Sequence, residues 1–412
     1  MRQIRNVTLT VCMAILFIGV IYIGVIGVLW QDPKAPLMFH EEALWGNEWE
    51  ACYEKVEDIV SKTDTFVRKE QQYEKRISRY IDAYMADMTL EQKLAQMMIL
   101  TNEHDIHEQN LRRYQPGGII LFEPDFRKKT VEKVRGRINQ LQSYMTVPLF
   151  VGVDEEGGQV SRLKVLQEES LPVFAGAREL SQLGMDAIEE DTTQKMQWFE
   201  KIGLNMNFAP VADVVGNKNS YMYMRSASED AQEVSAYIET VLTVMKQYQV
   251  MGCIKHFPGY GDNVNTHQGM AKDNRSIKDY EEKDFVPFHA GIRAGVDMVM
   301  VSHIIMSAVD KDHPASLSED VHSLLREDLN FNGVIIADDL NMQAILKTMT
   351  IGEATAKAYI AGNDMIFSAD FAASMKGATK AFENGELTEK QVDESVKRIL
   401  RMKIRNGLID ID

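Results

Sequence analysis

The segment K-H-F-P-G-Y-G-D-N-V-N-T-H, residues 255–267, places two histidines, a lysine and an aspartate within thirteen residues. Histidine titrates near neutral pH and can serve as both a general acid and a general base. A proline and two glycines between the histidines predict a loop that bends away from the preceding apolar run. Asn265 stands two residues before His267, where an aspartate would stabilise a protonated imidazole. The segment therefore predicts acid–base chemistry on a loop, and a solvated or structural histidine is the alternative.

Carboxylates directly follow two other apolar runs. Residues 151–163 read V-G-V-D-E-E-G-G-Q-V-S-R-L, and residues 334–342 read V-I-I-A-D-D-L-N-M. Carboxylates and arginine suit hydrogen bonding to sugar hydroxyls, whereas a metal site is the alternative use of the D-E-E cluster. Its spacing matches neither an EF-hand loop nor the H-E-x-x-H zinc motif, so we expect no metal ion and no cofactor. Because adjacent strand residues face opposite ways, one of Asp338 and Asp339 is expected in the site and the other to cap the next helix, unless both only shape the turn.

Eight short apolar runs, many of them β-branched, alternate with polar or amphipathic stretches from about 85 to 412, such as 130–144 and 233–248. Strands that alternate with helices predict a parallel sheet covered on both faces. Eight such units fit an α/β fold of the (β/α)8 TIM-barrel type, and an open doubly wound sheet is the alternative. No G-x-G-x-x-G follows a strand, so nothing favours a dinucleotide-binding fold. The eight predicted strands are 96–100, 117–122, 148–154, 204–211, 251–256, 296–303, 333–339 and 363–369.

Polar residues gather at the ends of these runs, where a barrel carries its chemistry. A lone polar group entering a core costs several kcal/mol unless it is paired, so a purely structural role explains so many of them poorly. Lys255 and His256 are adjacent, and we expect them to point to opposite sides unless the backbone bends. The full set is Asp154, Asp213, Lys255, His256, His303, Asp338 and Asp339.

The motifs resemble those of the glycoside hydrolase family 3 catalytic domain, in its β-N-acetylhexosaminidase branch. In the family's order they are V-D-E-E-G-G-Q-V-S-R-L, N-F-A-P-V-A-D-V with R-S-A-S-E-D downstream, K-H-F-P-G-Y-G-D-N-V-N-T-H, S-H-I with P-A-S-L-S, and G-V-I-I-A-D-D-L-N-M. They span about 85–410, and the K-H-F-P-G loop that ends in histidine is specific to this branch. The resemblance implies a (β/α)8 barrel without the family's second, sandwich-like domain.

The resemblance also implies a retaining mechanism and assigns roles in it to individual residues of this chain. Asp338 corresponds to the family's nucleophile, which forms a covalent glycosyl-enzyme, and Asp339 to its non-catalytic neighbour. His267 corresponds to the loop histidine that acts as general acid and base in place of the usual carboxylic acid. The residues that correspond to those holding the non-reducing terminal N-acetylglucosamine are Asp154, Arg162, Arg225, Lys255 and His256.

Three positions depart from the family pattern. Tyr260 stands where the family often has histidine, and Arg225 is followed by S-A-S rather than S-F-G. Asn265, which we count with the catalytic residues, replaces the aspartate that the branch pairs with its histidine. Asparagine can orient the ring but adds no charge, which predicts a less stable imidazolium at His267 and slower hydrolysis. A phosphorylase, an inactive sugar-binding envelope protein, and a glucosidase or xylosidase of the same superfamily are the alternatives.

The N-terminus predicts a membrane anchor. Residues 7–30 carry no charge over twenty-four positions, and about twenty apolar residues span a bilayer core. Arg2 and Arg5 precede this run and Asp32 follows it, which predicts a cytoplasmic N-terminus and a single-pass cell-membrane protein whose catalytic domain is extracytoplasmic. A cleaved secretory signal is the alternative. We expect an anchor at 1–30, a polar stalk with accessory helices at 31–84 and the catalytic barrel at 85–412.

The composition of the chain excludes some classes of binding partner. The net charge of −16 argues against a nucleic-acid partner. The three cysteines cannot all pair and none stands in a C-x-x-C spacing, so neither a disulfide framework nor a cysteine-zinc site is expected. The predicted partners are a carbohydrate substrate that contains N-acetylglucosamine, such as a cell-wall fragment, and the membrane through the N-terminal helix.

Overall fold

The computed structural model describes residues 67–101, 103–261 and 271–411. The chain divides into two compact units, Met1–Tyr80 and Ile81–Asp412. In the first unit the described residues, 67–80, are helical. No helix within the described ranges is long and apolar enough to cross a membrane. The predicted anchor at 1–30 and most of the predicted stalk lie outside these ranges, so both stay predictions, as do the predicted domain bounds.

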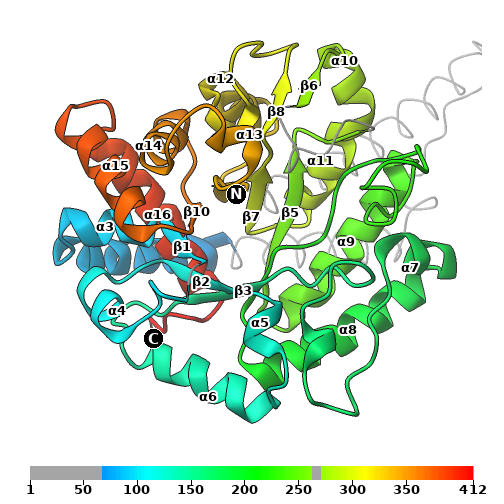
Figure 1. The fold of residues 1–412 in the computed structure, drawn as a ribbon, viewed down its shortest axis with the longest axis horizontal. Helices are drawn as coiled ribbons and strands as arrows, with labels where there is room; N and C mark the ends of the chain where they lie inside the picture. Colours follow the sequence, from blue (N-terminus) through cyan, green and yellow to red (C-terminus); the bar gives the residue numbers. More distant parts are fainter. Residues whose placement is uncertain (1–66, 102, 262–270, 412) are drawn as a thin grey trace, which may run out of the picture. The chain divides into compact units, whose positions relative to one another are not determined.

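The second unit is built on a parallel sheet of eight strands (Figure 1). The order of neighbours is β10-β1-β2-β3-β4-β5-β7-β9, and an isolated parallel bridge between Ile336 and Met365 brings the two ends together. The sheet is therefore a nearly closed barrel, and the predicted (β/α)8 architecture is confirmed for this unit. The strands are β1 (Met98–Leu100), β2 (Gly118–Leu121), β3 (Phe150–Val153), β4 (Met206–Asn207), β5 (Met251–Phe257), β7 (Met298–Val301), β9 (Val334–Ala337) and β10 (Ile366–Ser368).

Seven of the eight predicted runs contain a barrel strand, and β5 extends one residue past the eighth, 251–256; every residue of these strands is buried. Strands buried on both faces read as continuous apolar runs, which is why they could be recognised. Two further strands were not predicted. β6 (Ala271–Asp273) and β8 (Ile304–Met306) pair in parallel outside the barrel, and each has only three residues.

Helices surround the barrel strands (Figure 1). The predicted amphipathic segments 130–144 and 233–248 correspond to α6 (Val131–Gln142) and α9 (Ala231–Gln247). At several helix starts the side chain of the N-cap residue accepts hydrogen bonds from backbone N–H groups of the first turn. Asp230 does so for α9, and Thr388 does so for α16 (Glu389–Arg405). The helices are α3 (Leu90–Gln96), α4 (Glu108–Tyr114), α5 (Glu123–Phe126), α6 (Val131–Gln142), α7 (Ala177–Leu183), α8 (Met185–Ile202), α9 (Ala231–Gln247), α10 (Ile277–Asp279), α11 (Phe285–Arg293), α12 (Glu319–Ser323), α13 (Gln343–Leu346), α14 (Ile351–Ala361), α15 (Phe371–Glu383) and α16 (Glu389–Arg405).

Candidate active site

A continuous chain of ion pairs lies at the carboxyl ends of β3 and β5. The Nζ atom of Lys255 lies 2.8 Å from Oδ1 of Asp154 and 2.7 Å from Oε1 of Glu156. Arg225 donates from Nε to Oε2 of Glu156 at 2.9 Å and from Nη2 to Oε1 at 2.8 Å. Arg162 lies at the other end, with Nη2 3.8 Å from Oδ2 of Asp154. The structure thus brings four of the five predicted sugar-binding residues into one network with Glu156, and the fifth, His256, joins it through Arg225.

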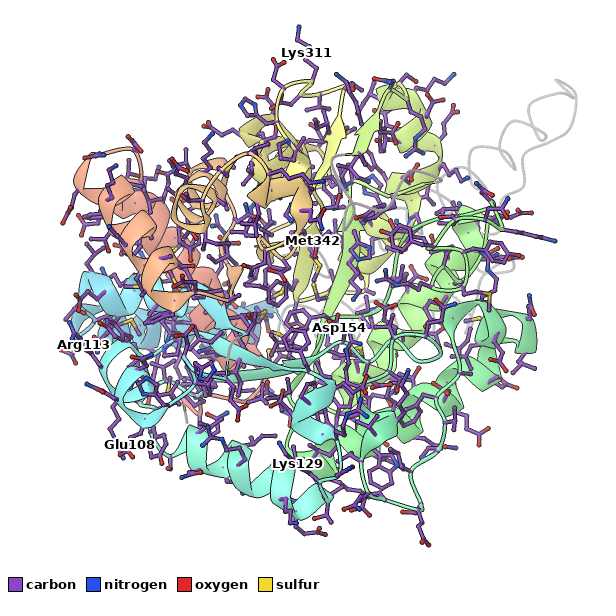
Figure 2. The ribbon with its side chains drawn as sticks, viewed as in Figure 1. Glu108, Arg113, Lys129, Asp154, Lys311 and Met342 are labelled. Atoms are coloured by element: carbon purple, nitrogen blue, oxygen red, sulfur yellow. The ribbon has the colours of Figure 1, made fainter. Side chains whose placement is uncertain are left out.

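Exposure separates the network into an inner and an outer part. The side chains of Lys255 and Glu156 are only 3% and 6% exposed, whereas those of Asp154 and Arg162 are 20% and 28% exposed. A ligand therefore meets Asp154 and Arg162 first, while Glu156 balances the two cations behind them. Figure 2 labels Asp154, after β3, and Met342, in the turn after β9, and both lie near the centre of the view.

His256 is held between an anion and a cation. Its Nδ1 atom lies 2.7 Å from Oδ2 of Asp213, and its Nε2 atom lies 3.4 Å from Nη2 of Arg225. In the neutral ring with its proton on Nδ1, the imidazole donates to the carboxylate and accepts from the guanidinium. Asp213 also accepts the backbone N–H groups of His256 at 3.2 Å and of Tyr260 at 2.6 Å. This buried aspartate therefore fixes both the orientation of the ring and the first residues of the following loop.

Lys255 and His256 both reach the network, instead of lying on opposite sides of a regular strand. The register of β5 against β7 shifts between Ile254 and Phe257, the stretch that holds both residues. Strict alternation of side chains requires a regular strand. The expected exception, a bend in the backbone, is what the structure has.

Asp338 and Asp339 follow β9 and differ in their partners. Oδ1 of Asp338 accepts the backbone N–H of Asp339 at 2.9 Å, and the Asp338 side chain is half-buried. Oδ1 of Asp339 accepts from the backbone N and from Nδ2 of Asn341, at 2.9 and 2.8 Å. Asp339 therefore closes a local turn. The prediction that it caps the next helix is wrong, because α13 has Met342 as its N-cap.

The segment that carries Asn265 and His267 lies outside the described residues, so their catalytic assignment stays a prediction. The residues on either side of that segment are tightly anchored. Arg275, shortly after β6, pairs with Asp273 and Asp284 at 2.8 and 2.6 Å. A Cβ atom on Gly259 would lie 2.4 Å from Oδ1 of Asp284, at a φ of +122° that favours glycine. The glycine is required by this close approach of the backbone to the ion pair.

A family model, the glycosyl hydrolase family 3 N-terminal domain, matches residues 89–402. The chain belongs to glycosyl hydrolase family 3. The predicted family is confirmed, and relatives named for β-hexosaminidase and β-N-acetylglucosaminidase support the predicted branch within family 3.

Two curated relatives illustrate the degree of similarity. β-Hexosaminidase A of Pseudoalteromonas piscicida is 28% identical over 327 residues, which are 72% of this chain and 54% of the relative. A β-hexosaminidase of Stenotrophomonas maltophilia (strain R551-3) is 31% identical over 231 residues, which are 55% of this chain and 68% of the relative. The chain thus spans about half of the first relative and two thirds of the second.

Two solved structures match most of this chain. A β-N-acetylglucosaminidase from Paenibacillus sp. str. FPU-7 has a TM-score of 0.74 and 29% identity, with 78% of this chain and 63% of that chain covered. The M tuberculosis LpqI structure has a TM-score of 0.72 and 28% identity, with 79% and 96% covered. The second match shows a solved chain that the alignment covers almost completely.

Sequence reasoning gave no role to two residues of the candidate site: Glu156 was not singled out, and Asp213 was noted only as a polar residue beyond a strand. Both are buried; Glu156 neutralises Lys255 and Arg225, and Asp213 orients His256. Both stand inside motifs that carry the resemblance, D-E-E and A-P-V-A-D. The available signal was the need of buried Lys255 and Arg225 for a shared counter-ion. Asp154 and Glu156 of the D-E-E cluster pair with Lys255, and no cluster of His, Cys, Asp or Glu within the described ranges is arranged to hold a metal ion.

Proposed function

We propose that the chain is a retaining β-N-acetylhexosaminidase that removes a non-reducing terminal N-acetylglucosamine through a covalent intermediate on Asp338. The observation that carries the proposal is the buried ion-pair chain from Asp154 through Lys255 and Glu156 to Arg225. It offers carboxylate acceptors and cationic donors beyond the strand ends of a barrel, where polyhydroxylated substrates of such folds bind. The names of the relatives support the same activity.

The proposed reaction has two steps. In the first, the carboxylate of Asp338 attacks the anomeric carbon, the glycosidic C–O bond breaks, and His267 gives its proton to the leaving oxygen. In the second, His267 takes a proton from water, the water oxygen bonds to the anomeric carbon, and Asp338 leaves as a carboxylate. Each step inverts the anomeric centre, so the product keeps the β configuration. A neutral histidine would not repel the anionic nucleophile as a second carboxylate would.

A panel of aryl β-glycosides tests the proposal. Wild-type protein is expected to hydrolyse the N-acetylglucosaminide much faster than the glucoside or xyloside, at a rate independent of phosphate, with β-N-acetylglucosamine as the first product by NMR. A rate that requires phosphate and yields the sugar phosphate would instead identify a phosphorylase. Tight binding of N-acetylglucosamine without turnover, unaffected by Asp338→Ala, would show a sugar-binding protein in place of an enzyme.

Asn265→Asp is expected to raise kcat for the aryl N-acetylglucosaminide. An aspartate beside His267 would stabilise the imidazolium that forms when water is deprotonated, and acid–base assistance contributes roughly 10²–10⁴-fold in enzymes. We expect an increase of about tenfold or more, because asparagine already supplies orientation without charge. Steady-state kinetics of the two proteins across pH measure this, with Asn263→Asp as a control that adds the same charge on the same segment. Equal or lower kcat in Asn265→Asp would contradict the prediction.

We also propose that residues 7–30 anchor the protein once in the cell membrane, with the catalytic domain outside the cytoplasm. The apolar run and the arginines before it support this topology. A domain so placed would meet cell-wall fragments and related glycans. Protease treatment of intact cells tests the arrangement: digestion of the catalytic domain from outside agrees with it, whereas protection of a membrane-bound chain until the cells are opened contradicts it.

A further inference from the structure

One motif of the sequence has no part in the ion-pair network or in the proposed reaction: S-H-I, with P-A-S-L-S downstream. Ser302 and His303 come directly after β7, and Ala315–Leu317 form a single 3-10 turn after β8. The structure brings the two halves together, because Nδ1 of His303 lies 2.7 Å from Oγ of Ser316. Both side chains are completely buried. Polar groups at this depth are costly unless they are hydrogen-bonded, so the partners of this pair decide its role.

Ser316 is held in place through its own backbone. Its N–H group donates to the carbonyl oxygen of Ser302 at 2.9 Å, and its carbonyl oxygen accepts from Nδ2 of Asn363 at 2.8 Å. The same nitrogen of Asn363 donates to the carbonyl oxygen of Ala358, in α14, at 2.7 Å. The hydroxyl of Ser316 is therefore a fixed partner for the ring of His303.

The other nitrogen of the His303 ring reaches the turn that carries the proposed nucleophile. Nε2 lies 3.0 Å from the backbone oxygen of Asp339. A carbonyl oxygen only accepts, so Nε2 carries a proton, and in the neutral ring Nδ1 then accepts from the Ser316 hydroxyl. His303 thus joins Ser316 to Asp339 by two hydrogen bonds of fixed direction.

Asp338 is fixed on both sides by this arrangement. Its backbone N–H donates to the carbonyl oxygen of Val301, in β7, at 2.9 Å, and its Oδ1 accepts the backbone N–H of Asp339 at 2.9 Å. The carbonyl oxygen of Asp339 accepts from His303 and from the backbone N–H of Met342, each at 3.0 Å. A rotation of the turn that moved the Asp339 N–H would turn the Asp338 carboxylate with it. His303 opposes that rotation, because its ring would lose a buried hydrogen bond.

We propose that His303, held by Ser316, is a positioning residue for the nucleophile Asp338; this rests on the proposed function. It acts through the carbonyl of Asp339 and keeps the Asp338 carboxylate directed at the anomeric carbon. A misplacement of about 1 Å can cost roughly 10²-fold in rate. The effect belongs to the rate of bond formation and not to sugar binding, because the predicted sugar contacts belong to other side chains.

N-Acetyl-5-fluoroglucosaminyl fluoride tests the role, because it separates attack from binding. An oxygen of Asp338 bonds to the anomeric carbon as fluoride leaves, and the 5-fluorine slows hydrolysis of the adduct, so mass spectrometry counts the labelled chains. His303→Phe keeps an aromatic ring but has neither nitrogen. It is expected to lower the maximal labelling rate about 10²-fold. The half-saturating concentration and the final fraction of labelled chains should stay at their wild-type values.

Three further variants show whether the hydrogen bonds are responsible. His303→Gln should restore the labelling rate to within a few-fold of wild type, because the amide nitrogen of glutamine can take the place of Nε2. Ser316→Ala removes only the second partner of the ring, and the rate should fall about threefold to tenfold, the effect of one hydrogen bond. His313→Phe makes the same exchange at a histidine whose side chain is 56% exposed, and should behave as wild type.

Wild-type labelling by His303→Phe would overturn the role. A smaller fraction of labelled chains that react at the wild-type rate would do so too, because it would show that His303 only maintains the fold. A change confined to the half-saturating concentration would assign His303 to binding and overturn positioning. If wild type forms no adduct on Asp338, the proposed function is wrong, and hydrogen exchange of residues 337–342 decides. Faster exchange in His303→Phe but not in His303→Gln supports a turn held by His303, and equal exchange overturns it.

Discussion

Asp338→Asn is expected to lower kcat for an aryl β-N-acetylglucosaminide by about 10⁴-fold or more, because it removes the only group assigned to attack the anomeric carbon. Substrate binding should change far less than kcat, since the predicted sugar contacts belong to Asp154, Arg162, Arg225, Lys255 and His256 and the substitution leaves these side chains in place. The carboxamide has nearly the same shape and keeps an oxygen that can accept the backbone N–H of Asp339, as Oδ1 of Asp338 does at 2.9 Å. Single-turnover kinetics with calorimetry of N-acetylglucosamine binding separate the two effects.

Asp339→Asn is the matched control, because it makes the same chemical change one residue further on. The amide oxygen can still accept the two hydrogen bonds that Asp339 receives from Asn341, so the turn after β9 should persist. We expect its kcat within a few-fold of wild type. A small anion offers a second criterion: azide should restore turnover to Asp338→Gly and give the α-glycosyl azide. Comparable losses in the Asp338 and Asp339 asparagine variants, or no rescue by azide, would remove Asp338 from the role of nucleophile.

The barrel could be predicted because each of its strands can be recognised in the sequence alone. A strand buried on both faces is a short apolar run, and such runs recur between helical segments, so the eight strands needed no knowledge of contacts. β6 and β8 have no such signal. Ala271–Asp273 includes two charged residues, and its strand is defined by its pairing with β8, which is distant in sequence. Tertiary pairing of this kind cannot be seen in the local pattern.

The sequence motifs identified the residues that are expected to contact the sugar, but not the buried residues that support them. Asp154, Lys255, Arg225 and His256 were identified through motifs, and the structure gathers them into one network. Glu156 was passed over, because its part follows only from the burial of two cations, which the sequence does not display. Asp213 was noted as a polar residue beyond a strand, but its hold on His256 depends on a contact across 43 positions of sequence. The structure is therefore needed to identify the counter-ions and the residues that orient the predicted sugar-binding side chains.

The two adjacent glutamates after β3 should respond in opposite ways to the same substitution. Glu156→Gln is expected to lower the free energy of unfolding by about 3–5 kcal/mol near pH 7, because it leaves buried cations without their shared anion. Both oxygens of Glu156 accept from Arg225 or Lys255, so the amide nitrogen would have to face a cationic donor. The network that holds Asp154 would loosen with it, and kcat/KM should fall about 10²-fold or more.

The effect of Glu156→Gln should depend on pH in a defined direction. Burial alone would raise the pKa of Glu156, but Arg225 and Lys255 outweigh it and hold the pKa well below the ordinary 4.5. A carboxyl with a depressed folded-state pKa stabilises fully above its unfolded pKa and loses that contribution as pH falls further. The difference in melting temperature between wild type and Glu156→Gln should therefore be largest near neutrality and shrink as pH falls below about 4.5.

Glu155→Gln should show the reverse. Burial raises the pKa of Glu155, although Lys195 and backbone N–H groups oppose the shift. Its Oε2 accepts the backbone N–H groups of Arg162 and Leu163 at 2.7 and 3.0 Å, while Oε1 has no hydrogen-bond partner among the described residues. An amide can keep the accepting oxygen and put its nitrogen at the other position. Because ionisation of Glu155 costs stability as pH rises above 4.5, the variant should match or exceed wild type near pH 7 and converge with it in acid. Equal destabilisation by both substitutions would show that volume and packing, and not charge pairing, govern this turn.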